Sequence, residues 1–440
     1  MRRILAIANI AIHSAVRSRM VVCLIALLAI AVIGLPLTIK GDGTAEGQLR
    51  VTITYSLGAA FALLALASLW AGALSIAREI EDKQIQLLAT KPVRRAEIWI
   101  GKWLGLMAVN TALLLAAAAA TGLLLPREKL NAQTDENAPA WTAVHRSISP
   151  QHEDRSEEAR AQLAQRKAAG AIPEGIDDAT ALRAIQQELL VRAATVAPAQ
   201  QRTWHIQLPR ALRADEQIRL RFRYSASSMG LDTVRGRWII GTPAQPAIWQ
   251  TDSANTPEIY QSLAVPANAF ANERELTVTY VNQDPSDTTL VFNPQDGLRV
   301  LVPAGTFLAN YARAIVLLLL RLGFLTALGV TAGAIFSSPV ALFVALALMA
   351  MSHMASFTTS DALLAPSGLS ALLAAPSRAL QAALAPLGAP PALDAVASGL
   401  LVETRWLLRV AFIQLALYGG ALAALGTRLL NRRELALPAI

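Results

Sequence analysis

The sequence has very little cysteine and little charge. Its one cysteine, Cys23, lies within an apolar run, so no disulfide framework can form within the chain. Charged residues make up 16% of the 440 positions, against about 25% in a typical soluble domain. Hydrophobic residues reach 54% and are gathered in blocks. This composition excludes a small disulfide-rich domain and indicates an integral membrane protein.

The sequence also lacks the short motifs of common enzyme sites. Gly101-Lys102 has neither the upstream glycine nor the following Ser or Thr of a phosphate-binding loop. No H-E-x-x-H or G-x-S-x-G motif occurs, and the five histidines do not cluster at metal-ligand spacing. We therefore expect no catalytic residue, no metal site, no cofactor and no nucleotide site on this chain.

The apolar blocks give six stretches long enough to cross a bilayer, which takes about 20 residues. They are 20–39, 53–77, 101–125, 308–335, 339–357 and 404–427. A long polar region, 126–305, separates the first three from the last three. We therefore expect an N-terminal membrane half at 1–125, an extracytoplasmic domain at 126–305 and a C-terminal membrane half at 306–440.

Basic residues predict the orientation. Residues 1–19, 78–102 and the C-terminal tail are rich in Lys and Arg, and all three fall on one side if six helices alternate. That side is the cytoplasm, so both termini are expected there. This distribution also accounts for the net charge of +8 without nucleic-acid binding. Residues 3–18 have one apolar face and read as an interfacial helix, with a basic cap on the first span as the alternative. We expect the N-terminus to be retained rather than cleaved.

The polar region changes its pattern near its middle. Residues 151–197 have helical spacing, whereas in 216–225 apolar residues alternate with Arg219, Arg221 and Arg223. Several such short segments predict a β-sandwich over about 202–303. The three arginines are either a solvated sheet face or a site for an anionic ligand. The predicted fold class is thus a membrane α-helical bundle of six transmembrane helices with an extracytoplasmic α+β insertion containing a β-sandwich.

Two further features concern the C-terminal half. Prolines interrupt the apolar residues of 358–403 before a full span accumulates, which predicts broken helices at the outer leaflet or an ordinary interfacial loop. Arg313, Arg321 and Arg409 lie within apolar runs, where charges are costly. Arg321 is the deepest, and we expect it to be paired structurally or to face a translocation path.

The segment 77–105, "AREIEDKQIQLLATKPVRRAEIWIGKWLG", lies between the second and third spans. Lys91-Pro92 breaks its helical pattern, and Pro92 suits the first position of a new helix. The segment resembles the first cytoplasmic loop of permease subunits of ATP-binding-cassette (ABC) transporters, in the six-helix exporter class often called type V. The matching residues are Glu79, Leu87, Leu88, Pro92, Arg95, Gly101 and Lys102. Together with Arg94, they are the residues that we expect to couple to the ATPase. The small residue that the class often has near Lys83 is absent, and the resemblance does not cover 126–305.

The resemblance implies a machine with several subunits in the bacterial cytoplasmic (inner) membrane. Two permease subunits, identical or different, would pair in the lipid. Each would dock a separate cytoplasmic ATPase, two copies in all, through a coupling helix at 79–98 within the loop 78–100. Trp99 and Trp103 would anchor this element.

Two other functions remain open at this point. In the first, a mechanotransmission complex, the ATPase cycle would move the extracytoplasmic domain without transporting a substrate. In the second, a membrane-anchored module, the β-sandwich would bind a ligand such as a glycan. For an exporter, the apolar interior favours an amphipathic or lipid-like cargo over a small ion.

Overall fold

The computed structural model describes a large part of the chain: residues 1–39, 50–82, 93–125, 144–151, 155–172, 177–213, 216–227, 233–285, 288–294, 296–358 and 391–432. The chain divides into two units, and each is described by itself. The first unit combines Met1–Val144 with Gly305–Ile440, and the second is His145–Ala304.

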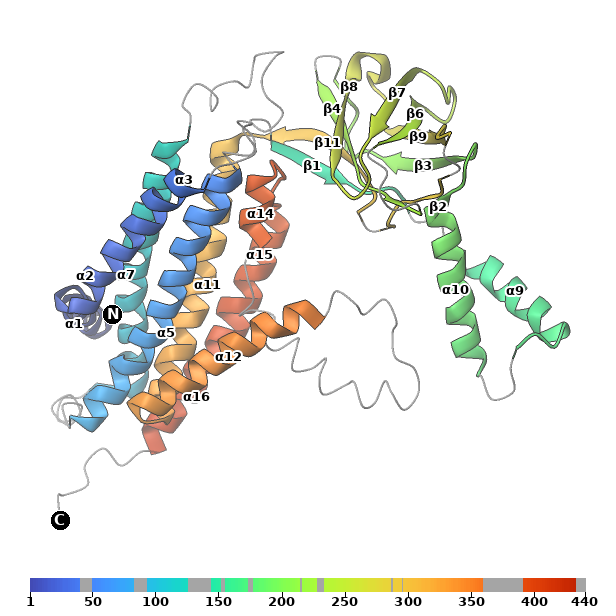
Figure 1. The fold of residues 1–440 in the computed structure, drawn as a ribbon. Coiled ribbons are helices and arrows are strands. Elements are labelled where there is room, and N and C mark those ends of the chain that lie inside the picture. Colours follow the sequence, from blue (N-terminus) through green and yellow to red (C-terminus); the bar gives the residue numbers. More distant parts are fainter. Residues whose placement is uncertain are drawn as a thin grey trace. The chain divides into compact units, whose positions relative to one another are not determined.

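The first unit is helical. Its elements are α1 (Arg2–Arg17), α2 (Arg19–Ala29), a π-helical turn (Ile30–Gly34), α3 (Leu35–Thr38), a second π-helical turn (Thr52–Leu57), α5 (Gly58–Glu81), α7 (Arg95–Leu124), α11 (Phe307–Ile335), α12 (Ser338–Thr358), α14 (Pro391–Ala397), α15 (Thr404–Ala411), a third π-helical turn (Phe412–Gly419) and α16 (Gly420–Arg432). Helices α5, α7 and α11 run side by side and pack on one another (Figure 1).

Among the described residues, five continuous helical runs have the length and apolar composition of a membrane span. They are Arg19–Thr38, Thr52–Glu81, Arg95–Leu124, Phe307–Ile335 and Thr404–Arg432. The sixth predicted span, 339–357, coincides with α12, whose apolar stretch Ser338–Met351 is shorter than these five. The chain is therefore a multi-pass helical membrane protein, and the sixth crossing stays a prediction. Most of 358–403, the predicted interrupted segment, lies outside the described residues.

Small residues allow α5 and α11 to approach closely. Gly329 and Gly333 lie one turn apart on α11. A Cβ atom at Gly333 would come 2.1 Å from the Ala73 carbonyl oxygen, and one at Gly329 would come 2.7 Å from that of Leu69. Lipid supplies no hydrophobic force between helices, so close backbone packing of this kind is a main source of their association.

A buried amide joins the same two helices to α7. The Nδ2 atom of Asn110 donates to Ser68 Oγ at 2.9 Å and to Thr326 Oγ1 at 3.2 Å. The three side chains come from α7, α5 and α11 and are all buried. A polar group within an apolar bundle is costly unless it is hydrogen-bonded, so this contact fixes how the three helices are rotated against one another.

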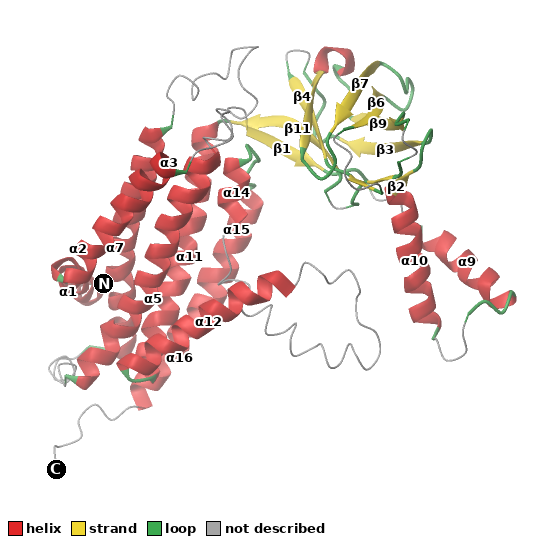
Figure 2. Ribbon diagram, in the orientation of Figure 1, coloured by secondary structure: helices red, strands yellow, loops and turns green. Residues whose placement is uncertain are grey.

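The second unit is rich in β-structure (Figure 2). Its strands are β1 (Val144–Ile148), β2 (Thr195–Val196), β3 (Gln201–Gln207), β4 (Gln217–Phe222), β5 (Ser225–Ala226), β6 (Val234–Gly241), β7 (Trp249–Asn255), β8 (Gln261–Pro266), β9 (Glu275–Asn282), β10 (Leu290–Val291) and β11 (Leu298–Gly305). Two four-stranded sheets have the orders β1-β11-β4-β8 and β3-β9-β6-β7, and a small third sheet has the order β2-β10-β5.

Both four-stranded sheets contribute to one hydrophobic core. Leu220 and Phe222 of β4 meet Trp238 of β6 and Tyr280 of β9 in this core. The ring centroids of Phe222 and Trp238 are 4.5 Å apart, and those of Trp238 and Tyr280 are 4.7 Å apart. The alternation in 216–225 therefore reflects a half-buried strand whose arginines lie on the opposite face.

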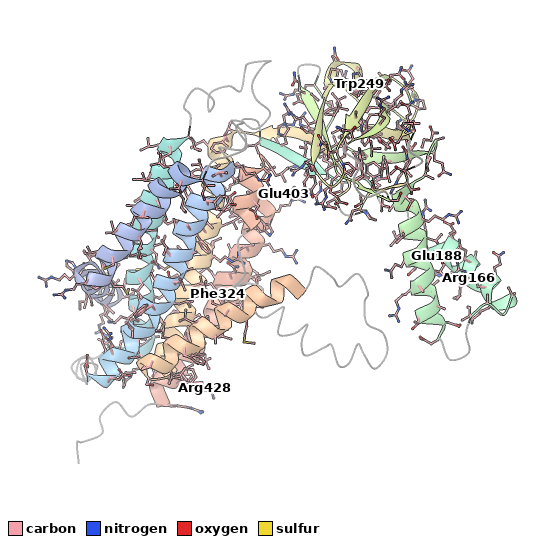
Figure 3. The ribbon with its side chains drawn as sticks, in the orientation of Figure 1. Arg166, Glu188, Trp249, Phe324, Glu403 and Arg428 are labelled. Atoms are coloured by element: carbon pink, nitrogen blue, oxygen red, sulfur yellow. The ribbon has the colours of Figure 1, made fainter. Side chains whose placement is uncertain are left out.

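Two helices precede the main strands, α9 (Ser156–Ala168) and α10 (Asp178–Ala194). Ala159 of α9 packs on Ile185 and Leu189 of α10 in a small core of their own. An ion pair at 2.7 Å between Arg166 and Glu188 also joins the two helices (Figure 3). This pair is exposed and contributes little to stability beside the apolar contact.

Candidate functional site at the facing ends of alpha-5 and alpha-7

The sequence motif brings together two charges across the loop between α5 and α7. Glu79 lies in the last turn of α5, and Lys102 lies near the start of α7. The Lys102 ammonium forms an ion pair with the Glu79 carboxylate, and the Lys102 side chain is only 5% exposed. A buried lysine needs such a partner. The pair therefore fixes the α5 end against α7 on either side of residues 83–92.

Helix α7 begins later than the sequence predicts. Pro92 was expected to open the helix, but Arg94 is extended, with φ −72° and ψ 144°, and the helix starts at Arg95. The Glu97 carboxylate accepts a hydrogen bond from the Arg94 backbone N–H at 2.9 Å. An acidic group in the first turn also complements the positive end of the helix dipole, so Glu97 stabilises a start at Arg95.

The structure describes some of the predicted coupling residues. Arg94 is exposed and Arg95 is half-buried. Leu87, Leu88 and Pro92 lie outside the described residues, as does half of the predicted coupling helix, residues 83–92. Its two flanks, Glu79 to Asp82 and Arg94 onward, are described.

Two tryptophans attach the start of α7 to other helices. Trp99 Nε1 donates to Thr331 Oγ1 of α11 at 3.2 Å, and Thr331 Oγ1 in turn donates to the Leu422 carbonyl of α16 at 3.1 Å. Trp103 Nε1 donates to the Gly323 carbonyl at 2.8 Å, and the two indoles stack with centroids 6.5 Å apart. Their polar atoms are therefore held by protein groups of the C-terminal half, beyond the membrane-interface role that sequence alone predicts.

Gly101 has a packing role that its place in the motif does not reveal. A Cβ atom there would lie 2.7 Å from Ile7 Cβ, and one at Gly105 would lie 2.6 Å from the Ala8 carbonyl oxygen. Both glycines face α1, whose buried residues include Ile7, Ala8 and Ala11. The apolar face of the amphipathic helix α1 thus packs on α7. The Gly-x-x-x-Gly spacing of 101–105 is a sequence signal for this contact that the resemblance alone does not use.

Glu81 is a functional candidate that sequence reasoning missed. Its carboxylate accepts hydrogen bonds from the backbone N–H and the hydroxyl of Ser338, the first residue of α12. It ties the end of α5 to the beginning of α12. No local pattern in either segment indicates this pairing, since the two residues are 257 positions apart.

The charges predicted within the membrane lie in different surroundings. Arg321 is buried in α11, with 9% of its surface exposed. Arg313, on the same helix, is half-buried, whereas Arg409 of α15 is exposed. Burial of Arg321 within the bundle fits both interpretations, structural pairing and a position along a translocation path.

In the second unit, Arg221 of β4 and Arg223, which directly follows that strand, both have partners. The guanidinium groups of Arg221 and Arg223 lie 4.3 and 4.7 Å from the ring centroid of Tyr260. Arg223 also pairs with Asp296 at 2.9 Å, and the Tyr260 hydroxyl donates to the same carboxylate. These contacts favour a structured polar face over an open anion site. Within the described part of the chain, no group of three His, Cys, Asp or Glu side chains could hold a metal ion.

Residues 5–139 match the family model described as "ABC-2 family transporter protein". No curated protein and no solved structure matches the chain. The matched region holds α1, the first three span-length helices and both flanks of residues 83–92. The match supports an ABC transporter permease, in a chain that the structure shows to carry several membrane-length helices.

Proposed function

We propose that this chain is the transmembrane permease subunit of an ATP-driven exporter of the six-helix (type V) class. A separate ATPase docks on the segment 79–98, two such ATPases serve the complex, and a second permease subunit pairs with this one. Nucleotide binds on the ATPase and not on this chain. The chain is inserted in a bacterial cytoplasmic membrane with both termini and residues 79–98 in the cytoplasm.

One observation carries the proposal. Each flank of residues 83–92 is tied to more than its own helix: Glu81 to α12, Lys102 to Glu79, and Trp99 to α11 and α16. A force on this segment therefore acts on helices of both membrane halves at once. A coupling element needs rigid attachment of this kind, whereas a passive connecting loop does not.

Charge reversal at the start of α7 tests the coupling role. The variant carrying Arg94→Glu and Arg95→Glu, and separately Pro92→Leu, should co-purify less well with the ATPase and lose its stimulation of ATP turnover in nanodiscs. Acidic residues at a helix start are favourable for the helix itself, by about 0.3–1 kcal/mol. The double reversal therefore alters the docking surface without unfolding α7.

The matched control is Arg432→Glu, which reverses an exposed charge in α16, at the tail expected on the same side. It should leave both co-purification and turnover unchanged. If the Arg94/Arg95 and Pro92 variants stimulate the ATPase as the wild type does, segment 79–98 is not the coupling element.

The size of the second unit supports a second candidate function. Residues 145–304 form a unit with a large core of their own, more than a loop between two spans requires. In a mechanotransmission complex, the ATPase cycle would move this unit to act outside the membrane. Replacement of residues 145–304 by a short Gly-Ser linker distinguishes mechanotransmission from export. Loss of the cellular function with substrate efflux retained favours mechanotransmission, and loss of efflux itself favours the exporter.

A further inference from the structure

A pocket of about 520 Å³ lies in the first unit, between the α1–α2 corner, α5 and α7. This volume falls in the range of about 300–1,000 Å³ that is usual for ligand sites. Of the residues assigned above to ATPase docking or coupling, Glu79, Asp82 and Lys102 line this pocket, at one end of it.

The pocket is amphipathic along the axis of α5. Ala67 and Ala71 line its apolar end, and Arg78 and Asp82 line its polar end. Because an α-helix rises about 1.5 Å per residue, the midpoints of these two ends are separated by roughly 16 Å. On the α7 wall, Leu113 lies toward the apolar end and Lys102 toward the polar end. This gradient fits a molecule with an apolar chain and a charged head.

The charges at the polar end balance. Arg78 and Lys102 are cationic, and Glu79 and Asp82 are anionic. Lys102 and Glu79 pair with each other, whereas Arg78 and Asp82 are exposed at the rim. A head group that carries both a phosphate and a cation would find one partner for each charge there. A purely anionic head group would meet two carboxylates.

One carboxylate at this end specifies the cation further. Glu79 pairs with Lys102, and its second oxygen, Oε2, is buried where a head group in the pocket does not reach it. Asp82 is exposed, so its carboxylate oxygens can accept hydrogen bonds from a bound cation. A primary ammonium has three N–H donors, as a lysine side chain does, and forms charge-assisted hydrogen bonds with a carboxylate. A quaternary ammonium has none.

We propose that this pocket binds a zwitterionic glycerophospholipid with a primary-amine head group, drawn from the leaflet beside Arg78 and Lys102. The head group phosphate contacts Arg78, its ammonium contacts Asp82, and an acyl chain extends between α2, α5 and α7 toward Ala67. By the positive-inside distribution of charge, that leaflet is the cytoplasmic one. The inference does not depend on the ATPase, because it concerns lipid binding by this chain alone.

Native mass spectrometry of the full-length, delipidated chain tests the proposal. The protein is titrated with phosphatidylethanolamine, phosphatidylcholine and phosphatidylglycerol of identical acyl chains. We expect phosphatidylethanolamine to bind tightest. Ala71→Trp fills the apolar end of the pocket and should weaken this binding on the order of tenfold, as overpacking of a filled site does. Ala116→Trp, an exposed position of α7 outside the pocket, should bind as the wild type does.

Val109→Trp fills the pocket from the opposite wall, on α7, and should weaken the same binding. It serves as an independent test if Ala71→Trp misfolds. Asp82→Asn should reduce the preference for phosphatidylethanolamine over phosphatidylcholine. The proposal is overturned if both tryptophan variants bind phosphatidylethanolamine like the wild type, or if phosphatidylcholine or phosphatidylglycerol binds the wild type as tightly as phosphatidylethanolamine does. If the variants lose the lipid preference but still stimulate the ATPase, the proposed permease function is unaffected. If they keep the lipid preference but no longer stimulate the ATPase, the proposed lipid site is unaffected.

Discussion

The Glu81 carboxylate accepts two hydrogen bonds from Ser338, one from its backbone N–H at 2.8 Å and one from its hydroxyl at 2.7 Å. The first N–H groups of a helix have no partner within it, and a carboxylate there also complements the helix dipole. A residue of α5 thus provides the N-terminal cap of α12. Movement of the segment after Glu81 would therefore reach α12 directly.

Removal of this cap should loosen the start of α12. Glu81→Ala removes the acceptor of the Ser338 N–H and hydroxyl and should destabilise the first turn of α12. Amide hydrogen exchange should become faster in the peptide that begins at Ser338. Asp82→Ala removes the neighbouring exposed carboxylate and should leave this peptide unchanged. Equal exchange in the two variants would mean that the Glu81–Ser338 contact is not maintained in solution.

The packing of α1 on α7 predicts unequal effects of glycine substitution along one helix. Gly105→Ala places a Cβ atom against the Ala8 backbone and should lower the free energy of unfolding by about 1–3 kcal/mol. Gly122→Ala, on the same helix, meets no atom within 4 Å. It should be neutral or stabilise by up to about 1 kcal/mol, because alanine favours the helix. Thermal unfolding of the detergent-solubilised chain measures both, and a comparable loss in the two variants would argue against this close contact.

The buried amide of Asn110 predicts a polarity requirement. Asn110→Leu keeps the branched shape of the side chain but leaves Ser68 Oγ and Thr326 Oγ1 without the amide. We expect a loss of about 0.6–2 kcal/mol, the range found for hydrogen bonds between membrane helices. The double variant in which Ser68 is also changed to Ala should lose less than the sum of the two single changes, because the two residues share one interaction. Strict additivity would show that the two side chains do not interact.

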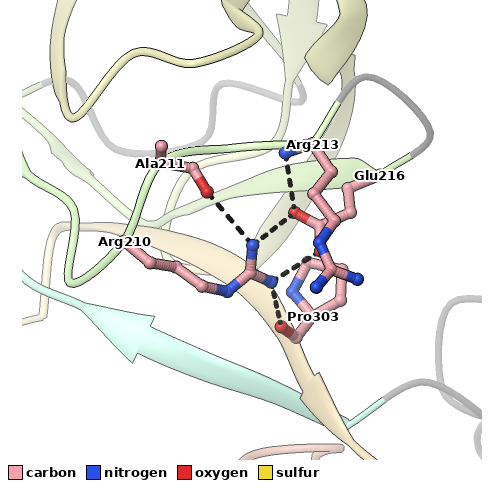
Figure 4. A network of polar contacts seen from close by, with 5 residues as sticks. All are labelled: Arg210, Ala211, Arg213, Glu216 and Pro303. Atoms are coloured by element: carbon pink, nitrogen blue, oxygen red, sulfur yellow. Dashed lines mark hydrogen bonds and ion pairs between the residues drawn. The ribbon is translucent and has the colours of Figure 1, made fainter.

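A polar network in the second unit predicts a dependence of stability on pH. Arg210 donates to both carboxylate oxygens of Glu216, at 2.6 and 2.9 Å, and to the Pro303 carbonyl at 3.2 Å (Figure 4). Burial alone would raise the pKa of Glu216, but the hydrogen bonds from Arg210 and from the Arg213 N–H, with the charges of both arginines, lower that pKa below its usual value.

Because the pKa is lower in the folded state, the stabilisation is present above the unfolded pKa of about 4.3 and is lost as the pH falls through the folded value. At neutral pH, Glu216→Gln should cost about 1–2 kcal/mol, since Arg210 is partly exposed to solvent. The difference from the wild type should shrink toward zero as the pH falls below about 4. Amide hydrogen exchange in peptides around 210–216 measures this difference in stability in the intact chain. The matching change at exposed Glu275 should show no such convergence, and a Glu216→Gln effect that is the same at every pH would contradict the network.

Local periodicity in the sequence predicted much of the fold. The apolar runs predicted six spans, and five of them coincide with span-length helices of the described residues, because hydrophobic length is a property of contiguous sequence. The period of two in 216–225 likewise predicted a half-buried strand, and Ile218, Leu220 and Phe222 are buried. The start of α7 was misplaced, because the proline rule favours Pro92 whereas the bond from Arg94 to Glu97 sets the start at Arg95.

The sequence by itself determined the class of the protein: an apolar, multi-pass chain with a basic segment between its second and third spans. Only the tertiary structure decided how that segment is attached. The pairing of Glu79 with Lys102, of Trp99 with Thr331 and of Glu81 with Ser338 depends on which helices pack together. Such contacts join positions far apart in the chain, and no local period or propensity encodes them.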